Sequence, residues 1–172
     1  MAEALSLAVP PELDALARQV LELACARDLK LASAESCTGG MLASLLTDIP
    51  GCSHAFERGF VVYTEAAKHE VLGVPADILE QDGAVSAPCA LALARGALER
   101  SKADLVAAIT GFAGPGPGPK DEPGLVHFAT ARRHRGLRHR VVHFGDVGRA
   151  RIRQGALEVA LEMMRDELEP AA

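Results

Sequence analysis

Two hydrophobic periodicities alternate along the chain, and together they predict an α/β protein. Apolar residues recur at helical spacing from Leu13 to Leu23, after a Pro10-Pro11-Glu12 start that suits a first helical turn. Short apolar runs have the length of buried strands, at 29–34, 59–63 and 105–110. The segments between these runs predict helices, at about 40–47, 64–72, 76–81 and 86–102.

The last part of the chain predicts a hairpin and a long helix. Leu125 to Ala131 and Leu137 to Phe144 indicate two strands that turn at Arg135-Gly136, and a helix is expected from about Val147 to Leu168. Strands separated by helices pair in parallel, whereas a hairpin adds an antiparallel strand. We therefore expect a single domain over residues 1–172, a three-layer α/β/α sandwich with a mixed, mostly parallel sheet of about five strands.

Composition narrows the classes of function. The 172 residues are 49% apolar but only 3% aromatic, and the formal net charge is −5, which disfavours base-stacking surfaces and non-specific nucleic-acid binding. The four cysteines are scattered without a C-x-x-C pair, so neither a disulfide framework nor a zinc site is signalled. A basic leader and a long apolar run are also missing, and we expect a cytoplasmic protein without a membrane segment.

The strongest chemical signal is the segment Ala34-Glu35-Ser36-Cys37-Thr38-Gly39-Gly40, which follows the first predicted strand. It places Ser36 at a strand tip beside the free N–H groups of a helix N-terminus, which suit an anion or a developing oxyanion. Ser36 is therefore a candidate nucleophile. The alternative is an ordinary cap, in which Ser36 or Thr38 accepts from the first helical N–H groups.

A nucleophilic serine needs a base, and no Ser-His-Asp arrangement is visible in the sequence. A lysine can replace histidine when burial lowers its pKa and leaves it neutral. Lys68 follows the second predicted strand by about one helical turn, at the same sheet edge as Ser36. Tyr63, at the end of that strand, is placed to relay a proton. The alternative is a solvated Lys68 and a Tyr63 buried in the core.

Two further features suggest a ligand. The stretch from Gly111 to Pro119 follows the third strand and is rich in glycine and proline, so it serves either as an anion-binding loop or as a plain surface loop. Thr110 stands at the tip of the same strand. Arg149, Arg151 and Arg153 begin the last helix, where the helix dipole disfavours cations, and they are explained either by an anionic ligand or by solvent exposure.

These motifs, taken in order, resemble the CinA C-terminal domain family over about residues 12 to 168. The resemblance is carried by AESCTGG (34–40), GFVVYTEAAK (59–68), GVP (73–75), GAVS (83–86), ITGFAGP (109–115) and FGD with the arginines that follow it (144–153). The characterised enzymes of that family are PncC-type nicotinamide mononucleotide (NMN) deamidases. The N-terminal molybdopterin-binding-like domain of full-length CinA proteins is absent, so the sequence is expected to represent the stand-alone form.

The resemblance implies a Ser/Lys amidase that uses no cofactor and no metal. Ser36 would be the nucleophile, Lys68 the general base and Tyr63 an aid to proton transfer. The substrate-binding residues implied are Thr38, Gly39, Gly40, Thr110, Gly111, Gly114 and an arginine of the last helix, with Arg153 preferred to Arg149. It also implies a homodimer or higher homo-oligomer and a role in pyridine nucleotide salvage.

The sequence departs from the family pattern at three places. The family usually has Tyr-Ser-Asn-Glu-Ala-Lys where this chain has Tyr63-Thr64-Glu65-Ala66-Ala67-Lys68, so Glu65 adds a negative charge. The motif after the glycine loop is one residue shorter, and two residues are inserted before Arg149. Two alternatives to the NMN reading remain: an amidase for another nucleotide-like amide, and a competence- or damage-associated binding module that uses the basic run 132–140.

Overall fold

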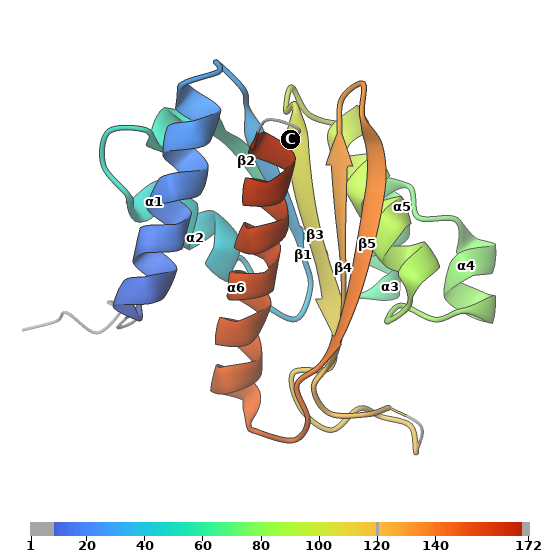
Figure 1. The fold of residues 1–172 in the computed structure, drawn as a ribbon. Helices are drawn as coiled ribbons and strands as arrows, with labels where there is room; N and C mark the ends of the chain where they lie inside the picture. Colours follow the sequence, from blue (N-terminus) through green and yellow to red (C-terminus); the bar gives the residue numbers. More distant parts are fainter. Residues whose placement is uncertain (1–8, 120, 170–172) are drawn as a thin grey trace, which may run out of the picture.

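The computed structural model describes residues 9–119 and 121–169, which form a mixed sheet with helices on both faces (Figure 1). In chain order the elements are α1 (Pro11–Cys25), β1 (Leu31–Glu35), α2 (Met41–Asp48), the 3₁₀ turn η1 (Ser53–Ala55), β2 (Phe56–Val61), α3 (Glu65–Leu72), α4 (Ala76–Gln81), α5 (Ala87–Glu99), β3 (Leu105–Gly111), β4 (Leu125–Arg132), β5 (Gly136–His143) and α6 (Arg149–Leu168). None of the described helices has the length and apolar character needed to cross a membrane.

The sheet order is β2-β1-β3-β4-β5, with β1 parallel to both β2 and β3 and the last two pairings antiparallel. Four of the five strands therefore point the same way, since β5 reverses the direction of β4. The predicted three-layer sandwich with a mixed, mostly parallel sheet is confirmed.

Two apolar cores separate the layers. On one face, α1, α2 and α6 pack against Leu31, Leu105 and Phe128; on the other, α3 and α5 pack against Ala32 and Val106. The two sets of helices lie on opposite sides of the sheet in Figure 1. The side chains of the central strands β1 and β3 thus alternate between two buried faces, as a three-layer fold requires.

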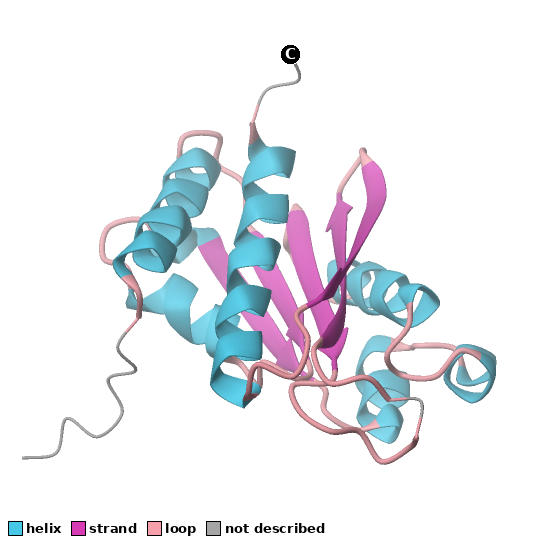
Figure 2. Cartoon of the chain, turned by 60° about the horizontal axis from the view of Figure 1, so that its bottom comes forward, coloured by secondary structure: helices cyan, strands magenta, loops and turns pink. Residues whose placement is uncertain are grey.

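The chain order creates a crevice at one edge of the sheet. After β1 the chain crosses to β2 on one side through α2, then returns to β3 on the other side through α5. The carboxyl ends of β1 and β3 therefore lie at a topological switch point, which is where open α/β sheets bind ligands. This is the lower edge in Figure 1, turned toward the viewer in Figure 2.

Most predicted elements are found within two residues of their expected ends. Thr64 accepts from the Ala67 N–H at 3.1 Å and Ser86 from the Cys89 N–H at 3.2 Å, so the caps expected for α3 and α5 are both present. The main difference is β2, which begins at Phe56 rather than Gly59 and ends before Tyr63. Its burial is partial because β2 is an edge strand, and the sequence pattern therefore marked only its more apolar half.

Candidate active site

A buried carboxylate shapes the turn that carries Ser36. Glu35 ends β1 with its side chain fully buried and accepts five hydrogen bonds at 2.7 to 3.1 Å. The donors are the hydroxyls of Ser33 and Thr38 and the N–H groups of Gly40, Leu42 and Ala43. A carboxylate at a helix N-terminus satisfies orphan N–H groups and complements the dipole. Glu35 therefore caps α2, whose N-cap residue offers no side-chain bond.

Sequence reasoning missed this role of Glu35. The available signal was an acid at the end of a buried strand, directly before small hydroxyl residues and two glycines. The turn itself requires those glycines, because Gly39 and Gly40 have φ of 60° and 96°, a region that side-chain-bearing residues rarely occupy.

This capping changes the expectation for three predicted substrate-binding residues. Thr38 is fully buried and its hydroxyl donates to Glu35 at 2.7 Å; the Gly40 N–H donates to the same carboxylate, and the Gly39 N–H donates to the Ser36 carbonyl. None of the three lines the cavity at the sheet edge. Their observed contacts hold the turn together, in place of the predicted contact with substrate.

Ser36 is free of the capping role that was its alternative interpretation. Its N–H donates to the Ile109 carbonyl at 3.1 Å, which fixes the residue against β3. Its Oγ lies 3.0 Å from the Lys68 Nζ and borders the cavity. The structure thus brings the predicted serine and lysine into direct contact across 32 residues of sequence.

Lys68 is buried, with 1% of its surface exposed, so its solvated alternative is wrong. The first turn of α3 directs the side chain back to the end of β2, where Nζ donates to the carbonyls of Val62 at 2.9 Å and Tyr63 at 3.0 Å. Two N–H bonds to carbonyls leave one position of the nitrogen for Ser36. In the neutral amine that position is the lone pair, which accepts the Ser36 hydroxyl proton.

Burial lowers the pKa of Lys68 below its usual value, because desolvation disfavours the charged amine. Negative charge at Cys89, Cys37 and Glu65 acts in the opposite direction. Burial, however, raises the pKa of both thiols to about 11, so they are uncharged near neutral pH. Glu65 is then the remaining opposing charge among these three, and neither cysteine is an effective thiolate nucleophile.

The cavity around Ser36 and Lys68 has a volume of about 380 Å³. It is formed where β1, β2 and β3 end, and its wall includes Tyr63, Thr110, Gly111 and Gly114. Tyr63 is 64% exposed, so it borders the opening instead of packing in the core. Thr110 is buried and donates to the Ala84 carbonyl at 2.7 Å, which leaves its oxygen as an acceptor toward the cavity.

The two arginines of α6 that are candidates for anion binding, Arg149 and Arg153, have different positions. Arg149 lines the cavity, and its guanidinium would lie 3.3 Å from a Cβ built on Gly114, so it adjoins the glycine loop. Arg153 instead donates its Nε–H to the Cys37 carbonyl at 2.8 Å and lies outside the lining. The preference for Arg153 as the anion ligand is therefore not supported by the geometry, which favours Arg149.

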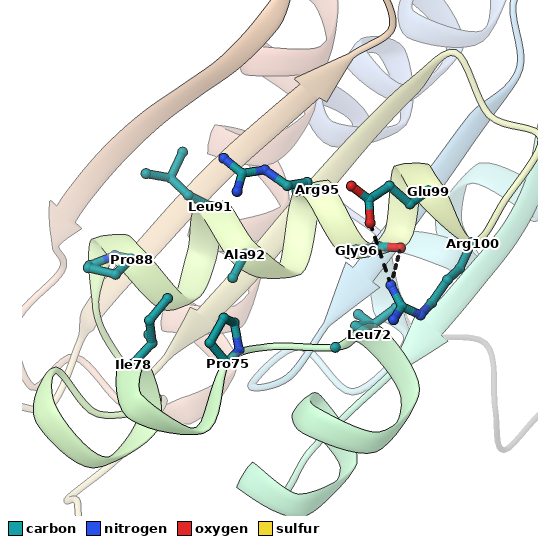
Figure 3. A pocket seen from close by; sticks show the side chains of 11 residues that line it. Leu72, Pro75, Ile78, Pro88, Leu91, Ala92, Arg95, Gly96, Glu99 and Arg100 are labelled. Atoms are coloured by element: carbon teal, nitrogen blue, oxygen red, sulfur yellow. Dashed lines mark hydrogen bonds and ion pairs between the residues drawn. The ribbon is translucent and has the colours of Figure 1, made fainter.

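A second cavity, of about 330 Å³, lies between α4 and α5 (Figure 3). Its lining includes the apolar side chains of Ile78 from α4 and Leu91 from α5, and also Arg95 and Arg100. No serine, cysteine, lysine or histidine lines it. Because it lacks a nucleophile and lies away from the switch point, it is not the candidate active site.

Three arginines of the basic run 132–140 make contacts within the molecule. Arg138 and Arg140 form ion pairs of 3.0 Å with Glu167 and Glu162 of α6, and Arg133 donates to the Ala103 carbonyl at 2.8 Å. These contacts attach the hairpin to α6 and to the connection before β3, and for these three arginines they do not favour a nucleic-acid surface. Among the described residues, no three His, Cys, Asp or Glu side chains converge as metal ligands do.

Comparison with known proteins identifies the family of the chain. Residues 13–168 match the family model for the CinA C-terminal domain. The chain belongs to the CinA C-terminal domain family. It is 43% identical over 155 residues to the nicotinamide-nucleotide amidohydrolase PncC of Escherichia coli (strain K12), which covers 89% of this chain and 93% of that protein.

Other relatives of the chain are longer proteins. It is 54% identical over 108 residues to a CinA-like protein of Akkermansia muciniphila and 40% identical over 157 residues to a putative competence-damage inducible protein of Caldicellulosiruptor bescii. These matches cover only 26% and 38% of the two relatives. Among solved structures, the competence/damage inducible protein CihA from Agrobacterium tumefaciens superposes with a TM-score of 0.87 at 45% identity, covering 92% of this chain and 96% of that one.

Proposed function

We propose that this protein hydrolyses the carboxamide of nicotinamide mononucleotide, giving nicotinic acid mononucleotide and ammonia. The observation that carries the proposal is the 3.0 Å contact between a buried lysine and a serine at the switch-point cavity. The similarity to PncC over most of both chains supports the choice of substrate.

In the proposed first step, neutral Lys68 takes the Ser36 hydroxyl proton as Oγ attacks the amide carbon. The resulting ammonium keeps its two bonds to the carbonyls of Val62 and Tyr63 and gives the new proton to the departing nitrogen. Ammonia leaves, and the acyl group remains on Ser36. We assign the oxyanion to the backbone N–H of Cys37, a residue of the cavity wall that directly follows Ser36.

The second step reverses these roles. A water molecule attacks the acyl carbon and loses a proton to neutral Lys68. The bond from that carbon to Ser36 Oγ then breaks, Lys68 returns the proton to Oγ, and the acid is released with Ser36 and neutral Lys68 restored. Tyr63, at the rim, is assigned to assist this proton transfer. Thr110 is assigned to accept an N–H of the carboxamide, which distinguishes an amide from an ester or acid.

The phosphate is assigned to the corner formed by Arg149 and Gly114, where a guanidinium lies beside the backbone of the glycine loop. Replacing Arg149 by alanine is expected to raise KM for NMN about tenfold with little change in kcat, because the charge binds a group remote from the reacting bond. Arg151→Ala is the matched control, since Arg151 is on the same helix but outside this cavity. Steady-state kinetics of both variants check this; equal effects would remove Arg149 from phosphate binding.

The rate of the reaction is expected to rise with pH and not to fall again through Lys68. Lys68 acts only when neutral, so kcat/KM rises as pH increases through the lowered pKa of Lys68 and levels off above it. A profile of ammonia release against pH tests this. Replacing Glu65 by Gln removes a negative charge that raises the pKa of Lys68, so the acidic limb of the profile is expected to move to lower pH. A limb that keeps its position would contradict the assignment of Lys68 as the base.

The function itself is tested by product analysis. Metal-free protein is incubated with NMN, with nicotinamide riboside and with nicotinamide, and the acid product and ammonia are both measured. We expect equal amounts of both products from NMN and much slower turnover of the two amides without phosphate. Turnover of neither NMN nor its riboside would exclude the proposal and favour a different amide.

A further inference from the structure

We propose that Glu65 selects for a cationic amide substrate by lying against the positively charged pyridinium ring of a nicotinamide nucleotide. The inference deepens the proposed function and rests on it. It concerns the ring of the substrate, whereas the assignments above concern the amide and the phosphate.

Glu65 belongs to the same cavity as the reacting pair. It is the first residue of α3, lies one helical turn before Lys68, and contributes to the cavity wall together with Ser36 and Thr64. The Thr64 cap fixes this turn, and therefore the position from which the exposed Glu65 side chain extends at the cavity wall. Its charge is also close enough to act on the Lys68 amine.

The charges of the cavity are separated in space. Glu65 comes from α3, on the face of the sheet that is covered by α3 and α5, whereas Arg149 comes from α6 on the opposite face. Ser36 and Lys68 lie at the sheet edge between them. The cavity therefore offers an anion and a cation at different walls.

A nicotinamide nucleotide has a matching arrangement. Its ring nitrogen carries a positive charge two bonds from the carbon that bears the carboxamide, and its phosphate is negative and several bonds further away. With the carboxamide at Ser36, the ring lies near the reacting pair and the phosphate reaches toward a more distant wall. A carboxylate near Lys68 and a guanidinium at the glycine loop therefore each meet a charge of opposite sign.

An uncharged ring would gain nothing from Glu65. The carboxylate would lose hydration on binding without an opposite charge in return, so a neutral aromatic amide of the same shape is expected to bind less well. The proposed substrate class is thus the N-alkylated pyridinium carboxamides that carry a phosphate.

The test is a double ratio that removes effects on Lys68. NMN is compared with the isosteric benzamide nucleotide, in which carbon replaces the ring nitrogen and the ring is neutral. Affinities for both compounds are measured by calorimetry in the Ser36→Ala background, with and without Glu65→Gln. Glu70→Gln is the control, because Glu70 is an exposed acid on the same helix that does not line the cavity.

We expect Glu65→Gln to reduce the preference for NMN over the benzamide nucleotide on the order of tenfold, and Glu70→Gln to leave it unchanged. A preference that changes less than twofold would overturn the inference, as would failure of NMN to bind. Because binding is measured without turnover, loss of the inference is separable from loss of the proposed function. The latter is decided by product formation in the unmodified protein.

Discussion

Replacing Lys68 by methionine is expected to lower kcat for NMN hydrolysis by at least about a thousandfold. Methionine keeps the apolar stem of the buried side chain but has no nitrogen to accept the Ser36 proton or to return it to the departing amine. Affinity for NMN is expected to stay within about threefold of the original, because Lys68 contacts Ser36 and two backbone carbonyls and not the phosphate corner. Stopped assays of ammonia release and calorimetric titration check the two parts.

Lys102→Met is the matched control for this experiment, since Lys102 is exposed and lies outside the cavity. Circular dichroism and thermal unfolding show whether each variant is folded. A folded Lys68→Met protein with more than about a tenth of the original kcat would show that another group acts as the base.

Replacing Glu35 by glutamine is expected to cost about 3 kcal/mol of unfolding free energy. The carboxylate accepts five hydrogen bonds in a fully buried position, whereas an amide turns an NH₂ group toward donors that need an acceptor. Because the same contacts hold the turn on which Ser36 stands, kcat is expected to fall about a hundredfold even in the folded fraction.

Urea unfolding monitored by circular dichroism measures the stability. Assays at a temperature well below the thermal unfolding transition measure the activity. Glu70→Gln serves again as the control. Full activity in a destabilised Glu35→Gln protein would mean that Glu35 supports the fold alone and does not position the nucleophile.

Local pattern was enough to place Ser36 and Lys68 at one edge of the sheet. Ser36 directly follows β1 and Lys68 lies in the helix after β2. Because these strands are parallel, their carboxyl ends lie at the same edge of the sheet. The sequence pattern did not show that Lys68 is buried in contact with Ser36. That burial depends on α5 packing behind α3, a long-range arrangement with no signature within the segment 59–68.

The anion-binding residues were harder to assign for a physical reason. Arg149 and Arg153 are one helical turn apart on the same side of α6, so sequence spacing treats them alike. What separates them is the path of the loop after β3, which places Gly114 beside Arg149 and leaves the Cys37 carbonyl to Arg153. The hydroxyl of Thr38 likewise donates to Glu35, because a buried carboxylate needs hydrogen-bond donors and Thr38 lies next to it.

The central claim is that Ser36 is the nucleophile, and the most direct measurement compares NMN hydrolysis by the unmodified protein, Ser36→Ala and Ser44→Ala. Ser44 is the matched control, an exposed serine of α2 that does not line the cavity. The account predicts that ammonia release is lost in Ser36→Ala, while NMN still binds, and is unchanged in Ser44→Ala. Hydrolysis by folded Ser36→Ala at the original rate would contradict it.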